Sequence, residues 1–278
     1  MARSSLLRLW GQVVAGSNRV QPNMTSKHNT SLCRRHRMKV LKYALPALAI
    51  AGSTSFMAPM AQSAEVSGNV ALVSDYKFRG ISQSDSKPSI QGGFDIAFDS
   101  GFYLGTWGAA VDFDCAIDTC GGANGGLELD YYGGYSHSFD GGLGIDVGYI
   151  YYDYPQDEGV LGDYEEVYAN VSFGGFSAGV AFSDEYWFET GEIVYLKAGY
   201  DMTLPGDWGL SFLVGQVDYD VASYVLTDKH VHWLVGLSKS WQGIDWSLTY
   251  EDTDIEESEC YDYDWCDAAL IFGMAKSL

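Results

Sequence analysis

The sequence has no acidic residue before Glu65 and no long apolar run after residue 64. Nine of the 16 Lys and Arg residues precede Glu65, whereas all 37 Asp and Glu residues lie from that position onward. Because so acidic a segment has no electrostatic attraction for nucleic acid, nucleic acid is excluded as a partner. The missing apolar run excludes a transmembrane helix, so only a closed β-barrel could cross a membrane.

Proline is scarce, with 6 residues, while glycine and tyrosine are abundant, with 33 and 20. Such a composition suits many short strands joined by tight turns. A chain of 278 residues could form one large domain or two small ones. The composition favours one repetitive β architecture over residues 65–278.

Two segments precede this predicted domain. Residues 38–64 have the features of a secretory signal peptide, with a basic start at Met38–Lys42, an apolar stretch and small residues before Glu65. Residues 1–37 are basic and rich in Ser, Asn and Arg, which suits an organelle transit peptide or an upstream extension of the gene model. We favour the extension, because a complete export signal follows.

From Glu65 onward, apolar and polar side chains alternate in twelve segments of about ten residues, the length and period of strands that span a membrane in a barrel. The first segment extends this alternation to Arg79, which predicts Tyr76 and Phe78 on the apolar outer face. The third segment places four apolar residues on the same face, opposite Asp112: Tyr103, Trp107, Val111 and Phe113. The predicted fold is a transmembrane antiparallel up-and-down β-barrel of about twelve strands.

Short glycine-rich turns alternate with long loops along this domain. The turns lie at 99–101, 140–142, 174–175, 205–207 and 242–244. The loops lie near 81–89, 114–126, 154–163, 184–192, 219–229 and 252–266. Outer-membrane barrels have short periplasmic turns and long external loops, so both termini are predicted in the periplasm.

A soluble β-sandwich or lipocalin-like barrel would show the same alternation with its apolar face turned inward. Three features favour the membrane barrel instead. The loops are asymmetric, Trp and Tyr lie near segment ends, and Lys and Arg are almost absent from the apolar face. The predicted location is the bacterial outer membrane.

The segment Val70–Gln83, VALVSDYKFRGISQ, resembles the opening of the TorF family of proposed porins, a bacterial family also catalogued as of unknown function. Further matches are Gly101–Trp107, Leu129–Tyr135 and Gly148–Pro155. The likeness covers most of the predicted domain. It implies a Gram-negative outer-membrane protein with a channel role, and it carries over no catalytic residue.

The partners expected of such a barrel are outer-membrane lipid and lipopolysaccharide, the barrel-assembly machinery and small diffusing solutes, and no cofactor is expected. One departure from this class is visible, because the chain ends in Leu278 and not in Phe. This departure puts recognition by the assembly machinery in doubt and leaves the predicted fold unchanged.

The predicted inner face is mainly acidic. The candidate pore-lining residues are Lys77, Arg79, Asp95, Asp112, Glu128, Asp130, Asp146, Glu166, Lys197, Asp201 and Asp245. An acidic lumen would concentrate cations and repel anions, although several carboxylates could instead pair with the two basic residues of the first segment. A barrel of about twelve strands lies between filled and open barrels in size, so inward side chains or an inward-folded loop could close it.

Four cysteines of the exported chain are candidates for disulfides within two loops: Cys115, Cys120, Cys260 and Cys266. His230 and His232 share a strand face but have no identifiable third metal ligand, so polar lining is the better interpretation. The acidic stretch 252–264 lacks the EF-hand arrangement. We therefore predict no metal site.

Two other functions remain open. A non-conducting barrel could serve adhesion or membrane integrity. A lipid hydrolase would need Ser, His and a carboxylate near the outer leaflet, and the suggestive cluster Ser136-His137-Ser138 lies instead beside the predicted turn at 140–142, with His137 toward lipid. We therefore do not expect an enzyme.

Overall fold

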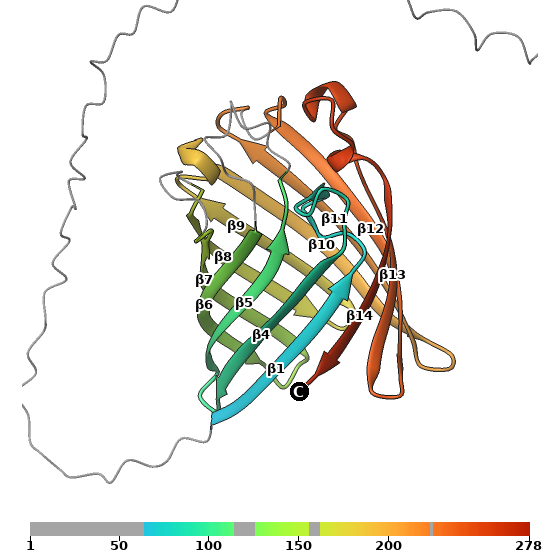
Figure 1. The fold of residues 1–278 in the computed structure, drawn as a ribbon. Helices are drawn as coiled ribbons and strands as arrows, with labels where there is room; N and C mark the ends of the chain where they lie inside the picture. Colours follow the sequence, from blue (N-terminus) through green and yellow to red (C-terminus); the bar gives the residue numbers. More distant parts are fainter. Residues whose placement is uncertain (1–63, 114–125, 156–161, 223–224) are drawn as a thin grey trace, which may run out of the picture. The chain divides into compact units, whose positions relative to one another are not determined.

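The computed structural model describes residues 64–113, 126–155, 162–222 and 225–278. These residues form a closed barrel of twelve antiparallel strands (Figure 1), which confirms the predicted fold and strand number. Residues 1–37 and nearly all of the predicted signal peptide lie outside the described residues.

The barrel strands in chain order are β1 (Ala64–Val73), β4 (Ser89–Phe98), β5 (Phe102–Val111), β6 (Gly126–Ser138), β7 (Leu143–Asp153), β8 (Tyr164–Phe173), β9 (Phe176–Ser183), β10 (Ile193–Leu204), β11 (Trp208–Tyr219), β12 (Lys229–Trp241), β13 (Ile244–Thr253) and β14 (Ala269–Ser277). The smaller elements are β2 (Lys77–Phe78), β3 (Ile81–Ser82) and the 3-10 helices η1 (Trp187–Glu189), η2 (Glu257–Glu259) and η3 (Asp264–Cys266). Within the described ranges, no helix is long and apolar enough to cross a membrane.

Each barrel strand pairs with its neighbours in the chain, and β1 pairs with β14 to close the ring. Short connections gather at one end of the barrel, which we call the turn end, and long ones at the other, the loop end (Figure 1). Glycines with positive φ, such as Gly101 (94°) and Gly142 (84°), occupy the predicted turns. The start of β1 and the end of β14 both lie at the turn end.

The third predicted segment faces the opposite way from the prediction. Asp95 of β4 pairs with Gly105 of β5, and Gly105 pairs with Tyr132 of β6, so the odd-numbered residues of β5 share the inner face with Asp95. Tyr103, Trp107 and Val111 therefore point into the barrel, and Leu104 points out. The prediction was wrong here because outward-facing Thr and Gly residues made the outer face of β5 look polar.

The first predicted segment is also shorter than expected. β1 ends at Val73, and residues 74–88, here called the first loop, turn into the barrel. Tyr76 and Phe78 consequently lie inside, where their rings contact Trp107 and Tyr152 at centroid distances of 5.5 Å and 5.9 Å. Their predicted place on the outer face was wrong, because the alternation continues past the residue where the strand stops.

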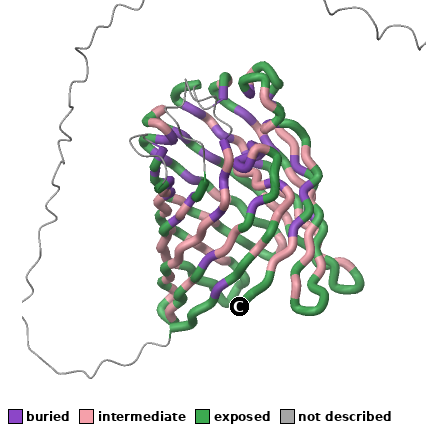
Figure 2. The backbone as a smooth tube through the Cα atoms, in the orientation of Figure 1, coloured by how far each residue is buried: buried purple, intermediate pink, exposed green. Residues whose placement is uncertain are grey.

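Most buried residues lie in the half of the barrel nearest the long loops, whereas the turn-end half is mainly exposed or intermediate (Figure 2). The buried apolar cluster combines first-loop Ile81 with inward side chains of the strand ends, among them Tyr152, Tyr164 and Val217. The first loop thus packs as the core of an otherwise hollow barrel.

Candidate functional site

The tip of the first loop is a two-residue hairpin turn. Phe78 pairs with Ile81, and the two residues between them, Arg79 and Gly80, have φ values of 52° and 88°. Positive φ at both central residues is the geometry of a type I′ turn, which requires glycine or a tolerant residue. A Cβ on Gly80 would overlap Thr253 and the Cβ of His232, so the tip is seated directly against the inner wall.

Arg79 carries the main contact between this tip and the barrel. Its Nη2 donates to both carboxylate oxygens of Glu166 on β8 at 2.7 Å, and the two side chains are only 7% and 3% exposed. Its guanidinium carbon lies 4.3 Å from the ring centre of Tyr195 on β10. Burial acts to lower the pKa of Arg79, but Glu166 outweighs burial and holds the pKa above its usual value. The contact is therefore shielded from bulk solvent by the surrounding side chains.

Tyr76 makes a second contact with the wall. Its hydroxyl donates to Glu128 of β6 at 2.8 Å, and the Tyr154 hydroxyl donates to the other oxygen of the same carboxyl at 2.5 Å. Burial, followed by the charge of Glu128, raises the pKa of Tyr76, so this hydroxyl stays a donor. Asp130, two residues along β6, is also buried, and its Oδ1 has no hydrogen-bond partner in the described part of the chain.

Lys77 joins the first loop to residues 254–268, here called the last loop. Its Nζ donates to the carbonyls of Gly80 at 3.1 Å, Trp265 at 3.0 Å and Asp267 at 2.6 Å. Burial lowers the pKa of Lys77, while the carboxylate of Asp75 acts in the opposite sense. Because three carbonyl oxygens surround the ammonium, this side chain acts as a clamp between two loops.

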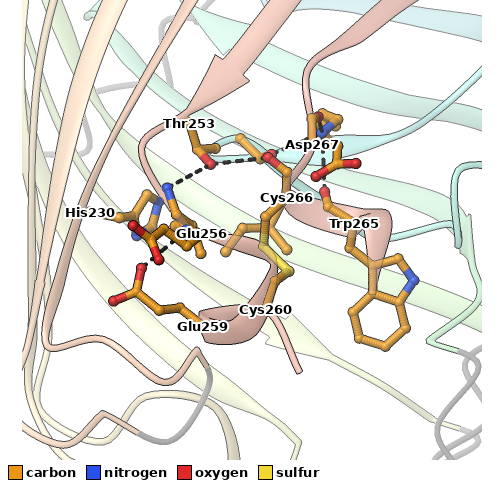
Figure 3. Close-up of a disulfide and its surroundings, with 12 residues drawn as sticks. His230, Thr253, Glu256, Glu259, Cys260, Trp265, Cys266 and Asp267 are labelled. Atoms are coloured by element: carbon orange, nitrogen blue, oxygen red, sulfur yellow. Dashed lines mark hydrogen bonds between the residues drawn. A yellow bond between two sulfur atoms is a disulfide. The ribbon is translucent and has the colours of Figure 1, made fainter. Parts of the chain in front are cut away.

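A disulfide closes the last loop beside this clamp. Cys260 and Cys266 are joined, and the Cys266 carbonyl accepts a hydrogen bond from the Thr253 hydroxyl at 3.0 Å (Figure 3). The disulfide holds the end of η3, the short helix that contains Trp265. The Trp265 indole in turn donates to Asp85 of the first loop at 2.8 Å. The other candidate pair, Cys115 and Cys120, lies outside the described residues.

The two histidines of β12 point inward and bind protein groups. His230 Nε2 donates to the Arg79 carbonyl at 2.9 Å, which leaves Nδ1 as the acceptor for the Tyr219 hydroxyl at 3.3 Å. His232 Nε2 lies 3.0 Å from the Tyr195 hydroxyl, and its Nδ1 lies 3.3 Å from Glu251. Across the described ranges, no group of three His, Cys, Asp or Glu residues is placed to hold a metal ion.

The turn-end half of the lumen, here called the vestibule, is polar and hollow. Asp95 accepts a hydrogen bond from the Tyr132 hydroxyl, and Asp146 accepts one from the Tyr103 hydroxyl, both at 2.6 Å. Cavities of about 350 and 500 Å³ lie along this wall, and the Lys197 side chain borders both. The larger cavity extends up to the underside of the first loop.

The structure places most of the predicted pore-lining residues on the inner face of a strand. These are Asp95, Glu128, Asp130, Asp146, Glu166, Lys197, Asp201 and Asp245. Lys77 and Arg79 also lie inside, but on the first loop and not on a barrel strand.

Asp112 was wrongly assigned to the lumen. Inward-facing Val111 ends β5, so Asp112 lies beyond the strand, where its exposed carboxylate is 3.0 Å from Lys87. The sequence analysis also missed Glu251, which lies on the inner face and is 6% exposed. The alternation of Asp245, Ser247 and Thr249 continues to Glu251, so the signal was present.

The profile of a family described as "bacterial protein of unknown function (Gcw_chp)" matches residues 58–277. The chain belongs to the Gcw_chp family. This finding agrees with the sequence resemblance in describing a bacterial family of unknown function, while the TorF name stays a prediction. No curated protein matches the chain.

Several solved structures resemble this Gcw_chp protein at low identity. The "KdgM porin" is 10% identical with a TM-score of 0.49, and the alignment covers 77% of this chain and 99% of that one. A "NanC porin" structure is 7% identical with a TM-score of 0.48, covering 75% and 97%. "LpxR from Salmonella typhimurium" is 10% identical with a TM-score of 0.39, covering 76% and 99%. At these scores the similarities support no conclusion about function.

Proposed function

We propose that this protein is an outer-membrane channel for small, preferentially cationic solutes, with the first loop restricting its loop end. The observation that carries the proposal is the contrast between the two faces of the closed barrel. Large apolar side chains are exposed along the outer face, including Val66 at 67%, Ile90 at 61% and Leu270 at 65%. A band of this kind is stable against lipid and would be costly against water.

The positions of outer-face charges support a lipid-facing band. Every charged outward-facing residue of the described strands lies within the last three residues at a strand end: Asp153, Glu165, Asp218, Lys229, Lys239, Asp252 and Lys276. Lys239 and Lys276 bend toward turn-end carbonyls, those of Gly206 and Gly243. Long basic side chains behave in this way at a membrane interface, where they keep the charge in water.

The inner wall supports passage of cations. Nine carboxylates of the described barrel strands face the lumen, against Lys197 on the strands and Lys77 and Arg79 on the first loop. Several of these carboxylates are bound by tyrosine hydroxyls and not by cations. An excess of negative charge in a confined aqueous space favours cations over anions.

Planar-bilayer recordings of the refolded protein in a salt gradient test this proposal. We expect a reversal potential that shows cation preference, and a smaller preference in Asp146→Asn, which removes a vestibule carboxylate. Asp153→Asn is the matched control, because Asp153 belongs to the same strand but faces outward at its loop end. Anion preference would refute the proposed selectivity. Absence of conductance from the wild type and from a variant with a released first loop would refute the channel.

A non-conducting barrel is the second candidate, favoured by one observation. The first loop fills the loop-end half with buried apolar and charged contacts, as a plug does. The hydrolase alternative has less support. Ser136 and Ser138 face inward while His137 faces outward between Tyr135 and Phe139, so the cluster does not converge.

A further inference from the structure

The wall of the lumen contains a receptor for a guanidinium group. Its parts are the Glu166 carboxylate on β8, the Tyr195 ring on β10 and the Tyr152 hydroxyl on β7, which lies 3.3 Å from Glu166 Oε2. All three side chains are at least nine-tenths buried. A carboxylate together with an aromatic face is the combination that proteins use to bind guanidinium ions.

Arg79 occupies this receptor but satisfies only part of its own hydrogen-bonding capacity. A guanidinium has five N–H donors, and a bidentate pair with a carboxylate normally uses two nitrogens. Here both carboxylate oxygens accept from the single nitrogen Nη2. Within the described residues, Nε and Nη1 are buried without a hydrogen-bond partner. The Arg79 backbone belongs to a tight turn, with positive φ at both Arg79 and Gly80.

The receptor is also next to open space. The cavity of about 500 Å³ is lined by Glu166, Tyr152 and Tyr195 together with Arg79 itself. His232 and Glu251 extend the same lining. A solute in this cavity therefore lies beside the receptor that Arg79 occupies. The first loop packs against the opposite side of the receptor.

We propose that Glu166, Tyr195 and Tyr152 form a binding site for guanidinium-bearing solutes, and that Arg79 is its tethered internal occupant. A solute of this class competes with Arg79 for Glu166, and its binding favours the state in which the first loop has left the wall. The proposal deepens the proposed function by naming the solute class, but the binding site exists whether or not the barrel conducts.

The test uses the refolded full chain in detergent micelles and its thermal unfolding midpoint. Arg79→Ala empties the site, and ethylguanidinium is the probe. We expect ethylguanidinium to raise the midpoint of Arg79→Ala in a saturable way, because a ligand that binds only the folded state stabilises it. Ethylammonium should have a smaller effect, and urea, which is planar but neutral, should have none. Arg79→Gln serves as a second vacated variant if Arg79→Ala does not fold.

Three comparisons decide the outcome. The double variant Arg79→Ala/Glu166→Gln should lose the response, whereas Lys87→Ala, which removes an exposed cation of the same loop, should behave like the wild type. The wild type should respond only above the effective concentration of its tethered arginine, on the order of millimolar or higher. Two results would overturn the proposal. One is an equal rise of the midpoint with ethylguanidinium in the wild type and in Arg79→Ala, and the other is a rise in Arg79→Ala/Glu166→Gln as large as that in Arg79→Ala. Because no current is measured, failure here is distinct from failure of the channel.

Discussion

Replacing Glu166 by Gln should release the first loop without unfolding the barrel. The variant leaves the Arg79 guanidinium buried without its counter-charge. Both side chains are less than a tenth exposed, so solvent screening does not reduce the effect. Removing one partner of a buried ion pair costs about 3–5 kcal/mol. We expect about 3 kcal/mol, because the Gln oxygen still accepts a hydrogen bond.

This loss exceeds that expected from a neutral hydrogen bond of the first loop. A hydrogen bond such as that from His230 to the Arg79 carbonyl contributes about 0.5–1.5 kcal/mol. Since 1.4 kcal/mol corresponds to a factor of ten, a loss of about 3 kcal/mol raises the population of the released state roughly a hundredfold. The hydrogen bonds between the barrel strands do not depend on the Arg79–Glu166 ion pair. The unfolding midpoint of the barrel should therefore change little, although the population of the released loop rises.

Single-channel recording in planar bilayers measures the predicted change as the open probability. Glu165→Gln is a closely matched control, because Glu165 precedes Glu166 on β8, faces outward and bonds the exposed Tyr149 hydroxyl. The variant Arg79→Gln/Glu166→Gln should be less stable than the wild type by less than the sum of the single changes, because no buried charge remains unpaired. Equal open probabilities in Glu166→Gln, Glu165→Gln and the wild type would refute the reasoning.

Three further predictions concern the loops and the outer face. Gly80→Ala should destabilise the seated first loop by about 1–3 kcal/mol through strain at positive φ and overlap with the wall; Gly141→Ala, with open space around it, should leave thermal unfolding and open probability unchanged. Cys260→Ser removes a loop closure that contributes about 2–3 kcal/mol, so hydrogen exchange in the last loop and the open probability should rise together; unchanged exchange would contradict this role. Leu248→Lys should destabilise the lipid-embedded barrel by about 2–4 kcal/mol in urea titrations in vesicles, because Leu248 faces outward. Inward-facing Thr249→Lys should destabilise it by clearly less, and equal losses in the two variants would contradict a lipid-facing outer surface.

The alternation and the turn residues were sufficient to predict the barrel. In β7, the apolar positions Val147 and Tyr149 face outward and Asp146 faces inward, as a period of two requires. The turns were recognisable because glycines such as Gly101 and Gly142 end short segments that begin with a polar residue, Asp99 and Asp140. Strand number and the gathering of both strand termini at the turn end follow from these two signals alone.

Inward aromatic residues could not be predicted in the same way. Tyr103 and Trp107 have the period of lipid-facing residues, but the Tyr103 hydroxyl is bound by Asp146, which comes more than forty positions later in the chain. The end of β1 at Val73 was equally hidden, since Tyr76 and Phe78 continue its pattern. In both cases a contact distant in sequence, not a local preference, decides which way the side chain points.

The contacts of the first loop have a consequence for the order of assembly. Although this loop follows the first strand, the groups that hold it are spread over about half of the chain, from Glu128 to the Asp267 carbonyl near the C-terminus. Its binding surface is complete only after the last strands have formed. The first loop therefore cannot complete its contacts with the wall before β13 and β14 have formed.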